Sequence, residues 1–310
     1  METASEDRGF RWCGPCIYHG AVPPLKFWIM YFGLGLIATA FELARPMRKL
    51  RYWARDAVIL DIISFFFYQF VVVYWASVLR SYIPLSFKPT HFLLSIPLPV
   101  RCVVYYVIGD FSGYWMHRLT HTRYLWRVHH FHHSTTQMYW LAGVRATVWQ
   151  QFLSNLPYIL WAPLIFDAPP AVFTGLLFLS IFTNHFMHMN FAWRSNWLEY
   201  VFVTPRSHHI HHSSSPEHYN ANYGVVFSMW DRMFKTWVSP DTTKVTSVGA
   251  GEIRNPLDAG WLMLGLFDLA TLQSWFTVRA KPAPAAGRAG GGSRRGRTSR
   301  SSGRRRAAGG

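Results

Sequence analysis

The stretch His117–His133, which reads HRLTHTRYLWRVHHFHH, decides the fold and chemistry expected of this chain. It opens with a His-x-x-x-His pair and closes with the run HHFHH. The run HHIHH at His208–His212 repeats that pattern later in the chain. Residues three or four apart share one face of a helix, so each cluster presents imidazoles side by side. The pattern therefore predicts three helical segments that turn histidines towards a common site.

The histidines that share a helix face in these clusters are His117, His121, His129, His132, His133, His208, His211 and His212. Imidazole is a ligand for iron, zinc, copper and nickel. Eight imidazoles are more than one metal needs, so the clusters predict a two-metal site. A loose histidine-rich tract would not require one-face spacing in three separate places. His130 and His209 point about 100° away from their neighbours, so we expect them behind the ligands or at the surface.

Composition indicates a membrane protein. Of the 310 residues, 50% are hydrophobic, 17% are aromatic and only 15% are charged, whereas about 25% charged is typical of soluble domains. The three cysteines imply no disulfide framework. The net charge of +16 does not indicate nucleic-acid binding, because residues 279–310 hold ten of the 31 Lys and Arg residues and no acid.

Five apolar stretches are candidates for membrane-embedded helices: residues 27–43, 57–79, 92–108, 148–166 and 171–187. The loop 45–55 carries five basic residues, which places it in the cytoplasm by the positive-inside rule. Pro97, Pro99 and Arg101 interrupt the third stretch, and 148–187 is expected to form a hairpin around residues 167–170. This topology places all three histidine clusters on the cytoplasmic side.

Three parts are expected: a polar segment 1–25, a membrane-embedded domain 26–278 and an Arg-rich tail 279–310. Cys13-Gly14-Pro15-Cys16 matches the thioredoxin motif in letters, but that motif works in a βαβ context that is not found here. Residues 257–278 fit an interfacial helix better than a span. The tail cannot bury a core and is expected to be disordered; binding to anionic lipid and passive solvation are both open for it.

Carboxylate ligands are scarce near the histidines. Between Asp110 and Asp231 the only acids are Asp167, Glu199 and Glu217. Soluble di-iron bundles use several Glu ligands, and structural zinc sites are closed and usually contain Cys. The site must therefore be nearly all histidine. Such a metal pair beside membrane helices suggests redox chemistry on a lipid.

The clusters resemble the three histidine boxes of the fatty acid hydroxylase / sterol desaturase superfamily. The flanking sequences resemble it too: Asp110-x-x-x-Tyr114-x-x-His117-Arg118, Leu125-Trp126-Arg127-x-His129, His188-Met189-Asn190, Thr204-Pro205-Arg206, Asn222-Tyr223-Gly224 and Trp230-Asp231-Arg232-Met233-Phe234. The resemblance covers roughly residues 90–238. It is greatest to the alkylglycerol monooxygenase-like and bacterial sterol-desaturase-like branches.

The resemblance implies an all-α integral membrane protein with about four to five membrane-embedded helices and a cytoplasmic helical cap. It implies two iron ions, with zinc as a substitute in recombinant protein, and O2 as cosubstrate. The electron donor would be cytochrome b5 or a ferredoxin/reductase with NAD(P)H. The expected location is the endoplasmic reticulum in a eukaryote or the inner membrane in a bacterium. A catalytically inactive protein that keeps a structural metal pair and a metal-handling transporter are the alternatives.

The resemblance carries residue roles over to this chain. The implied metal ligands are His117, His121, His129, His132, His133, His188, His208, His211 and His212. Asn184 stands where some members have histidine, and His185 is its neighbouring substitute. Residues expected behind the ligands are Asp110, Tyr114, Asn222 and Asp231. The spacing of Asp110, Tyr114, His117 and His121 (i, i+4, i+7, i+11) places them on one helix face, so Asp110 is expected to accept the free ring N–H of a ligating histidine; a charge in the first turn of a helix is the alternative. Sterol, fatty acyl, ether lipid, sphingolipid and carotenoid substrates all fit, and so do hydroxylation and desaturation.

Overall fold

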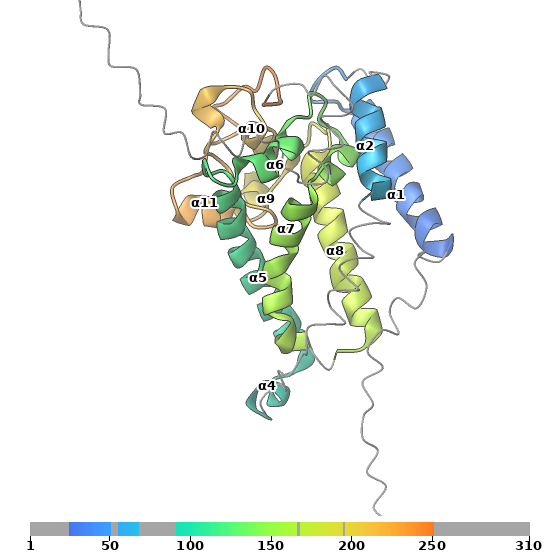
Figure 1. Cartoon of the computed structure of the whole chain (residues 1–310), viewed down its shortest axis with the longest axis vertical. Coiled ribbons are helices and arrows are strands. Elements are labelled where there is room, and N and C mark those ends of the chain that lie inside the picture. Colours follow the sequence, from blue (N-terminus) through green and yellow to red (C-terminus); the bar gives the residue numbers. More distant parts are fainter. Residues whose placement is uncertain (1–24, 51–54, 68–90, 166–167, 195, 251–310) are drawn as a thin grey trace, which may run out of the picture. The chain divides into compact units, whose positions relative to one another are not determined.

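The computed structural model describes residues 25–50, 55–67, 91–165, 168–194 and 196–250. Within these ranges β structure is confined to three isolated bridges, in agreement with the predicted all-α class (Figure 1). The helices are α1 (Leu25–Ala44), α2 (Arg55–Phe67), α4 (His91–Ser95), α5 (Leu98–Thr120), α6 (Trp126–His133), η2 (Trp140–Val144), α7 (Val148–Leu160), η3 (Ala162–Ile165), α8 (Pro170–His188), α9 (Asn196–Val201), α10 (Pro205–His211), η4 (Pro216–His218) and α11 (Met229–Met233). Residues 1–24 of the predicted polar segment, the predicted interfacial helix 257–278 and the predicted tail 279–310 lie outside the described residues.

Helix α1 is the one described helix that is long and apolar enough to cross a membrane. Its window Phe27–Ala44 has a mean hydropathy of 1.6, and only 17% of that window is buried. Leu36 and Leu43 are among the apolar side chains that it leaves exposed. Helix α2 contains a shorter apolar run, Val58–Phe67, and the rest of the second predicted span, residues 68–79, lies outside the described residues.

Prolines set the start of α5. Helix α4 ends at Ser95, and α5 begins at Leu98 with Pro99 in its first turn, because a proline disfavours the helical conformation of the residue before it and is tolerated in a first turn. Arg101 is buried and donates hydrogen bonds to the carbonyls of Ile96 (2.9 Å) and Leu164 (3.1 Å). The basic residue is therefore accommodated because it satisfies main-chain acceptors beside the break.

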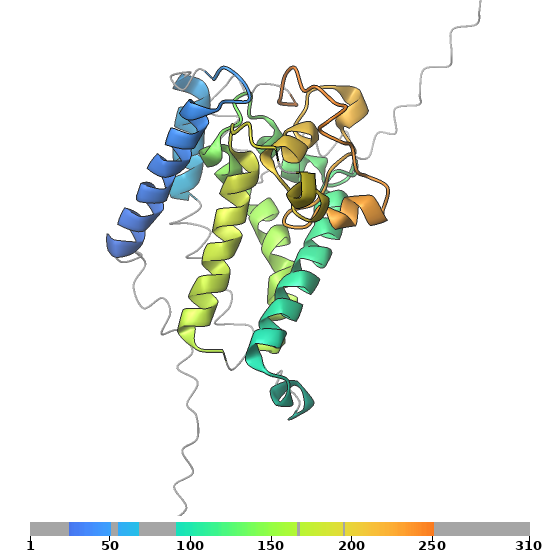
Figure 2. The same cartoon turned by 180° about the vertical axis from the view of Figure 1, so that it is seen from behind.

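The predicted helical pair around residues 167–170 is present as α7 and α8. The Thr147 side chain caps α7 by accepting the N–H of Gln150. Helix α7 ends at Leu160, earlier than the predicted residue 166, and the short helix η3 follows it. Helices α5 and α7 lie side by side (Figures 1 and 2). The Tyr158 ring of α7 lies against Gly109 of α5.

The histidine-bearing segments gather where α5 and α8 end. Helix α6 follows the end of α5 closely, and α10 contacts the end of α8 (Figure 2). Helices α1 and α2 both pack on η2, which precedes α7. Long helices thus deliver their C-terminal turns to one region, and the short helices α6 and α10 complete it.

The packing of α5 on α7 gives a test with an internal control. A Cβ atom at Gly109 would lie 2.6 Å from the Tyr158 ring, whereas nothing lies within 4 Å of a Cβ at Gly113. Overpacking should make Gly109→Ala less stable by about 1–3 kcal/mol. Gly113→Ala, on the same helix, should gain roughly 0.5–1 kcal/mol from helix propensity. Thermal unfolding in detergent measures both, and equal effects would contradict the α5–α7 contact.

Candidate metal centre

Three local structures position the histidines. His117 and His121 occupy the last turn and the C-cap of α5, and the HHFHH run forms the end of α6. Helix α10 begins with a capping box in which Thr204 and Ser207 bond each other's main chain. Pro205 occupies its first turn. The third cluster therefore starts from a rigidly defined helix terminus.

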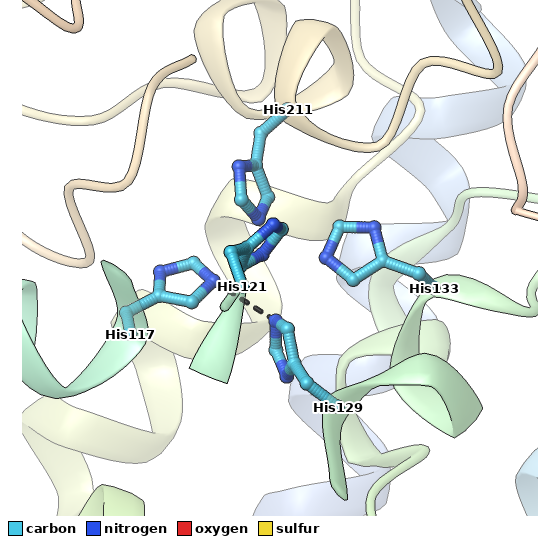
Figure 3. Close-up of side chains that lie close together, drawn as sticks. All are labelled: His117, His121, His129, His133 and His211. Atoms are coloured by element: carbon cyan, nitrogen blue, oxygen red, sulfur yellow. Dashed lines mark hydrogen bonds between the residues drawn. The ribbon is translucent and has the colours of Figure 1, made fainter. Parts of the chain in front are cut away.

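The structure divides the predicted ligands into two groups rather than one. The five-histidine group consists of His117, His121, His129, His133 and His211. One candidate ligand atom from each lies within 4.8 Å of every other. Figure 3 shows these rings converging from α5, α6 and α10. The Nε2 atoms of His117 and His129 are 3.0 Å apart.

The four-histidine group consists of His132, His188, His208 and His212, all buried, and its candidate ligand atoms also lie within 4.8 Å of one another. The Nε2 atom of His188 is 3.2 Å from that of His132 and 3.1 Å from that of His208. The two groups adjoin, since the rings of His133 and His212 stack with centroids 4.3 Å apart. Helices α6 and α10 thus each contribute to both groups, and neither group contains a carboxylate.

Main-chain carbonyls orient four of the rings. The Nδ1 atom lies within hydrogen-bond distance of a carbonyl oxygen in His117 (Tyr223, 2.7 Å), His132 (Arg145, 2.9 Å), His188 (Asn184, 2.6 Å) and His211 (Ala221, 2.8 Å). A carbonyl can only accept, so Nδ1 of each ring donates and carries the proton. The lone pair of each neutral ring is therefore on Nε2, which faces the interior of its group.

The unpartnered nitrogens fit a pair of metal ions. Among the described residues, seven buried imidazole nitrogens of the two groups have no hydrogen-bond partner: Nε2 of His121, His133 and His211, Nδ1 of His129 and His208, and both nitrogens of His212. Buried polar atoms are normally paired, and each ring offers a metal one nitrogen. A metal would therefore supply the missing partner of Nε2 in His121, His133 and His211 and of one nitrogen in His212. Two nitrogens bound about 2.1 Å from one metal at right angles lie about 3 Å apart, which matches the observed Nε2–Nε2 separations.

The environment keeps the rings neutral. Burial lowers the pKa of His117 to about 4 and that of His132 to about 3. The pKa values of the other seven histidines also lie well below the usual 6.5, first because of burial and then because of neighbouring imidazoles. A neutral imidazole is the form that binds a metal, so the site is ready for metal at neutral pH.

Besides His91 at the start of α4, four histidines of the described residues lie outside both groups. His185 contacts the Trp140 carbonyl through Nδ1 (2.7 Å) and the Tyr31 hydroxyl through Nε2 (2.6 Å), which ties α8 to α1. His130 lies 3.3 Å from the Ala250 carbonyl. His209 is buried rather than at the surface, and His218 contacts Ser213.

Asn184 does not point its amide at either group. Its Nδ2 donates to the Gly143 carbonyl (3.0 Å), and its own carbonyl accepts Nδ1–H of His188 (2.6 Å). In the structure Asn184 and His185 thus contact main-chain carbonyls and Tyr31, and His185 belongs to neither group. Gly143 is required there, because a Cβ atom would lie 2.8 Å from Nδ1 of His188.

The expected contact of Asp110 with a histidine is also corrected. The carboxylate accepts the main-chain N–H of Val226 (2.9 Å) and Phe227 (3.1 Å) and the indole N–H of Trp230 (2.8 Å). Burial raises the pKa of Asp110 to about 6, which leaves it mostly ionised at pH 7. Asp110 thus fixes the 226–230 loop against α5, because its helix face meets that loop rather than a ring.

Asp231, Asn222 and Tyr114 hold the loop that supports His117. Asp231 accepts the N–H groups of Tyr223 (2.7 Å) and Gly224 (2.8 Å). Asn222 exchanges hydrogen bonds with the main chain of Val238 and adopts a φ of 54°. The Tyr114 hydroxyl contacts the Thr236 side chain (2.8 Å). All three therefore act on the Tyr223 region, whose carbonyl meets His117, rather than on a histidine directly.

Two residues that support the site, Glu42 and Arg145, were not predicted from the sequence. Glu42 is fully buried, and its Oε1 accepts the N–H groups of Trp140 (2.7 Å) and Asn190 (2.9 Å), which flank the site. Arg145 supplies the carbonyl that meets His132. A charged residue in an apolar segment is costly unless it is paired. Glu42 and Asp61, the acids within the first two apolar stretches, therefore indicated from the sequence that each has a buried partner.

Comparisons with known proteins agree with this geometry. Residues 102–236 match the family model described as fatty acid hydroxylase, which confirms the predicted resemblance. The matched segment contains the three clusters, His188 and the supporting loop up to Thr236. No solved structure matches the chain.

Several curated proteins share this segment. Alkylglycerol monooxygenase from Danio rerio is 33% identical over 44% of this chain and 30% of its own length. Ornithine lipid hydroxylase OlsE from Rhizobium tropici is 32% identical over 49% of this chain and 46% of its own length. A very-long-chain aldehyde decarbonylase from Oryza sativa subsp. japonica is 27% identical over 41% of this chain and 21% of its own. The chain thus spans less than half the length of these relatives.

The lowered histidine pKa values predict acid sensitivity of the metal-free protein. Each folded pKa lies below the unfolded value of about 6.5, so between the two pH values only the unfolded chain binds a proton. This stability is complete above pH 6.5 and is lost as pH falls. Burial raises the pKa values of Asp110 and Asp231, so these two carboxylates favour the folded state as the pH falls. They are outnumbered by the nine histidines of the two groups.

We therefore expect the unfolding midpoint of protein treated with a chelator to fall between pH 7.5 and pH 5. Circular dichroism in detergent, with temperature as the denaturant, measures it. A constant midpoint over that interval would contradict burial of nine neutral imidazoles.

Asp110→Asn should destabilise the fold by about 1–3 kcal/mol, because an amide places an N–H group against donors that the carboxylate accepts. Denaturant unfolding measures the loss. Asp241→Asn is the matched control, since Asp241 is exposed and its pairs with Arg194 and Arg206 are at the surface; its effect should stay within about 0.5 kcal/mol. Equal effects of the two substitutions would contradict the role of Asp110.

Proposed function

We propose that this chain, whose residues 102–236 match the fatty acid hydroxylase family, is a membrane non-heme di-iron oxygenase that oxidises a lipid. The reaction would hydroxylate or desaturate an unactivated C–H position, using O2 and two external electrons. The observation that carries the proposal is the pair of histidine groups, five and four residues, in which all members but the half-buried His117 and His121 are buried and no carboxylate takes part.

The proposed ligands are the nine histidines of the two groups. In the five-histidine group they come from α5, α6 and α10; in the four-histidine group they come from α6, α8 and the end of α10. Two bound iron ions would supply the redox chemistry that activates O2, and zinc, which also binds imidazole, could replace them in recombinant protein. Their identity and number are part of the proposal.

The chain's own residues prepare this site in two ways. The carbonyls of Tyr223, Arg145 and Ala221 accept hydrogen bonds from Nδ1–H of their histidines, so the lone pair of each ring is on Nε2. Burial excludes water, since His208, His211 and His212 are each only 1% exposed. The neutral ligand shell would leave the positive charge of a bound metal uncompensated by the protein.

A lipid substrate is supported by the relatives and by the surface of the helices. The relatives' names refer to alkylglycerols, ornithine lipids and very-long-chain aldehydes. Apolar side chains are exposed along α1 (Leu36), α5 (Val103), α7 (Leu160) and α8 (Phe182). These surfaces suit bilayer contact, and a lipid would then reach the site from the side of the membrane.

We extend the proposal to topology and partners. Several membrane-embedded helices would hold the histidine groups at the cytoplasmic face, in the endoplasmic reticulum of a eukaryote or the inner membrane of a bacterium. Electrons would come from cytochrome b5 or from a ferredoxin and its reductase with NAD(P)H. The basic loop 45–50, which includes Arg45, Arg48 and Lys49, supports this orientation.

The proposal predicts that His121→Ala, His132→Ala and His211→Ala each abolish turnover, because each removes a ligand from one of the groups. His130→Ala, a change in the same run but outside both groups, should retain most of the activity. The assay is purified protein reconstituted with ferrous iron and a reductase chain, given mixed lipids under ¹⁸O2, with products read by mass spectrometry.

Incorporation of ¹⁸O, or loss of two hydrogens from a lipid, in the wild type but not in His132→Ala would support the enzyme. If several lipid classes give neither product while the wild type still binds two metals, the catalytically inactive alternative replaces it. Uptake of metal into vesicles without lipid oxidation would favour a transporter.

A further inference from the structure

A buried ion pair joins α2 to the segment after η2. Asp61 in α2 and Arg145 are 0% and 2% exposed. Nε of Arg145 donates to Oδ1 of Asp61 (2.6 Å), and the Tyr139 hydroxyl donates to Oδ2 (2.8 Å). Two charges buried this deeply are tolerated when each is paired and hydrogen-bonded. Both carboxylate oxygens are used, so Asp61 is held in one orientation.

The same arginine carries the carbonyl that orients His132. The Arg145 oxygen accepts Nδ1–H of His132 (2.9 Å), while its guanidinium is held by Asp61 and lies 3.3 Å from the Ser134 hydroxyl. Fixing the side chain restricts the main chain of that residue. Asp61 therefore acts on the ring of His132 through one residue.

The five-histidine group has a parallel arrangement. Asp231 accepts the N–H of Tyr223 (2.7 Å), and the Tyr223 carbonyl meets Nδ1 of His117 (2.7 Å). In each group a buried carboxylate thus fixes one residue, and the main-chain carbonyl of that residue orients a histidine. The two chains of contacts end in different groups, so they are separable by experiment.

We propose that Asp61, through Arg145, is a positioning residue for the four-histidine group, and that α2 is thereby part of the metal centre. This inference rests on the proposed dimetal function. Loss of the carboxylate frees the Arg145 carbonyl, so His132 is no longer held with Nε2 towards His188 and His208. The five-histidine group keeps its own support.

The test measures metal release rather than turnover. Purified full-length protein is loaded with Co²⁺, whose absorption reports its coordination, and then mixed with excess chelator. The wild type should release two ions, each seen as one kinetic phase of the absorption change. His188→Ala removes a ligand from the four-histidine group only, and His121→Ala removes one from the five-histidine group only, so the two variants show which phase belongs to which group. A wild type that binds fewer than two ions would overturn the dimetal function itself, independently of the variants.

Asp61→Asn should accelerate release from the four-histidine group by about 10–100-fold, the usual effect of losing such support, and leave the other phase unchanged. Asp231→Asn is the matched control and should accelerate the other phase. Added to His132→Ala, Asp61→Asn should cause no further change. Equal acceleration of both phases, or no change, would overturn the inference.

Tyr139→Phe covers the case in which Asp61→Asn does not fold. It removes one hydrogen bond to the carboxylate and keeps the ring. A smaller acceleration of the same phase is expected. An unchanged phase in this variant would also overturn the inference.

Discussion

The metal centre depends on keeping nine imidazoles neutral and close together without a carboxylate to balance a charge. Protonation of any ring would bury an uncompensated cation beside other imidazoles, which is why burial lowers every pKa in the set. A neutral charge alone does not determine the orientation of a ring. Main-chain carbonyls orient the rings by fixing which nitrogen carries the proton, and the one that meets His117 lies 106 residues away along the chain. The surrounding fold is therefore built to present carbonyls at set places.

Much of this was accessible from the sequence. The spacing of the histidines predicts a helical segment at each cluster, and α5, α6 and α10 carry the three clusters. The apolar stretch 92–108 was expected as one element, but it is divided between α4 and α5 at the prolines. The shortage of acids correctly predicted an all-histidine set of candidate ligands. Both inferences depend only on the residues of one segment, so they can be made from a single sequence.

The division into two groups was not accessible. His129, His132 and His133 share a helix face by spacing, yet His132 joins a different group. Neighbours from α8 and α10 select that arrangement, and no local rule contains them. The same limit explains Asp110: its helix face was predicted, but the loop that it meets lies 116 residues further along the chain. Asp61 and Arg145 are 84 residues apart, so only the fold relates them.

The sharing of α6 and α10 between the groups has a consequence for assembly. His132 sits between His129 and His133 in the chain, so an ion held by those two residues also orders the backbone that carries His132. The conformational entropy of that turn is then lost when the first ion binds and is not lost again when the second binds. If two ions bind as proposed, the second should enter a pre-ordered site and bind more tightly than the first. Singly loaded molecules would be scarce during maturation, and the chain would pass almost directly from empty to full.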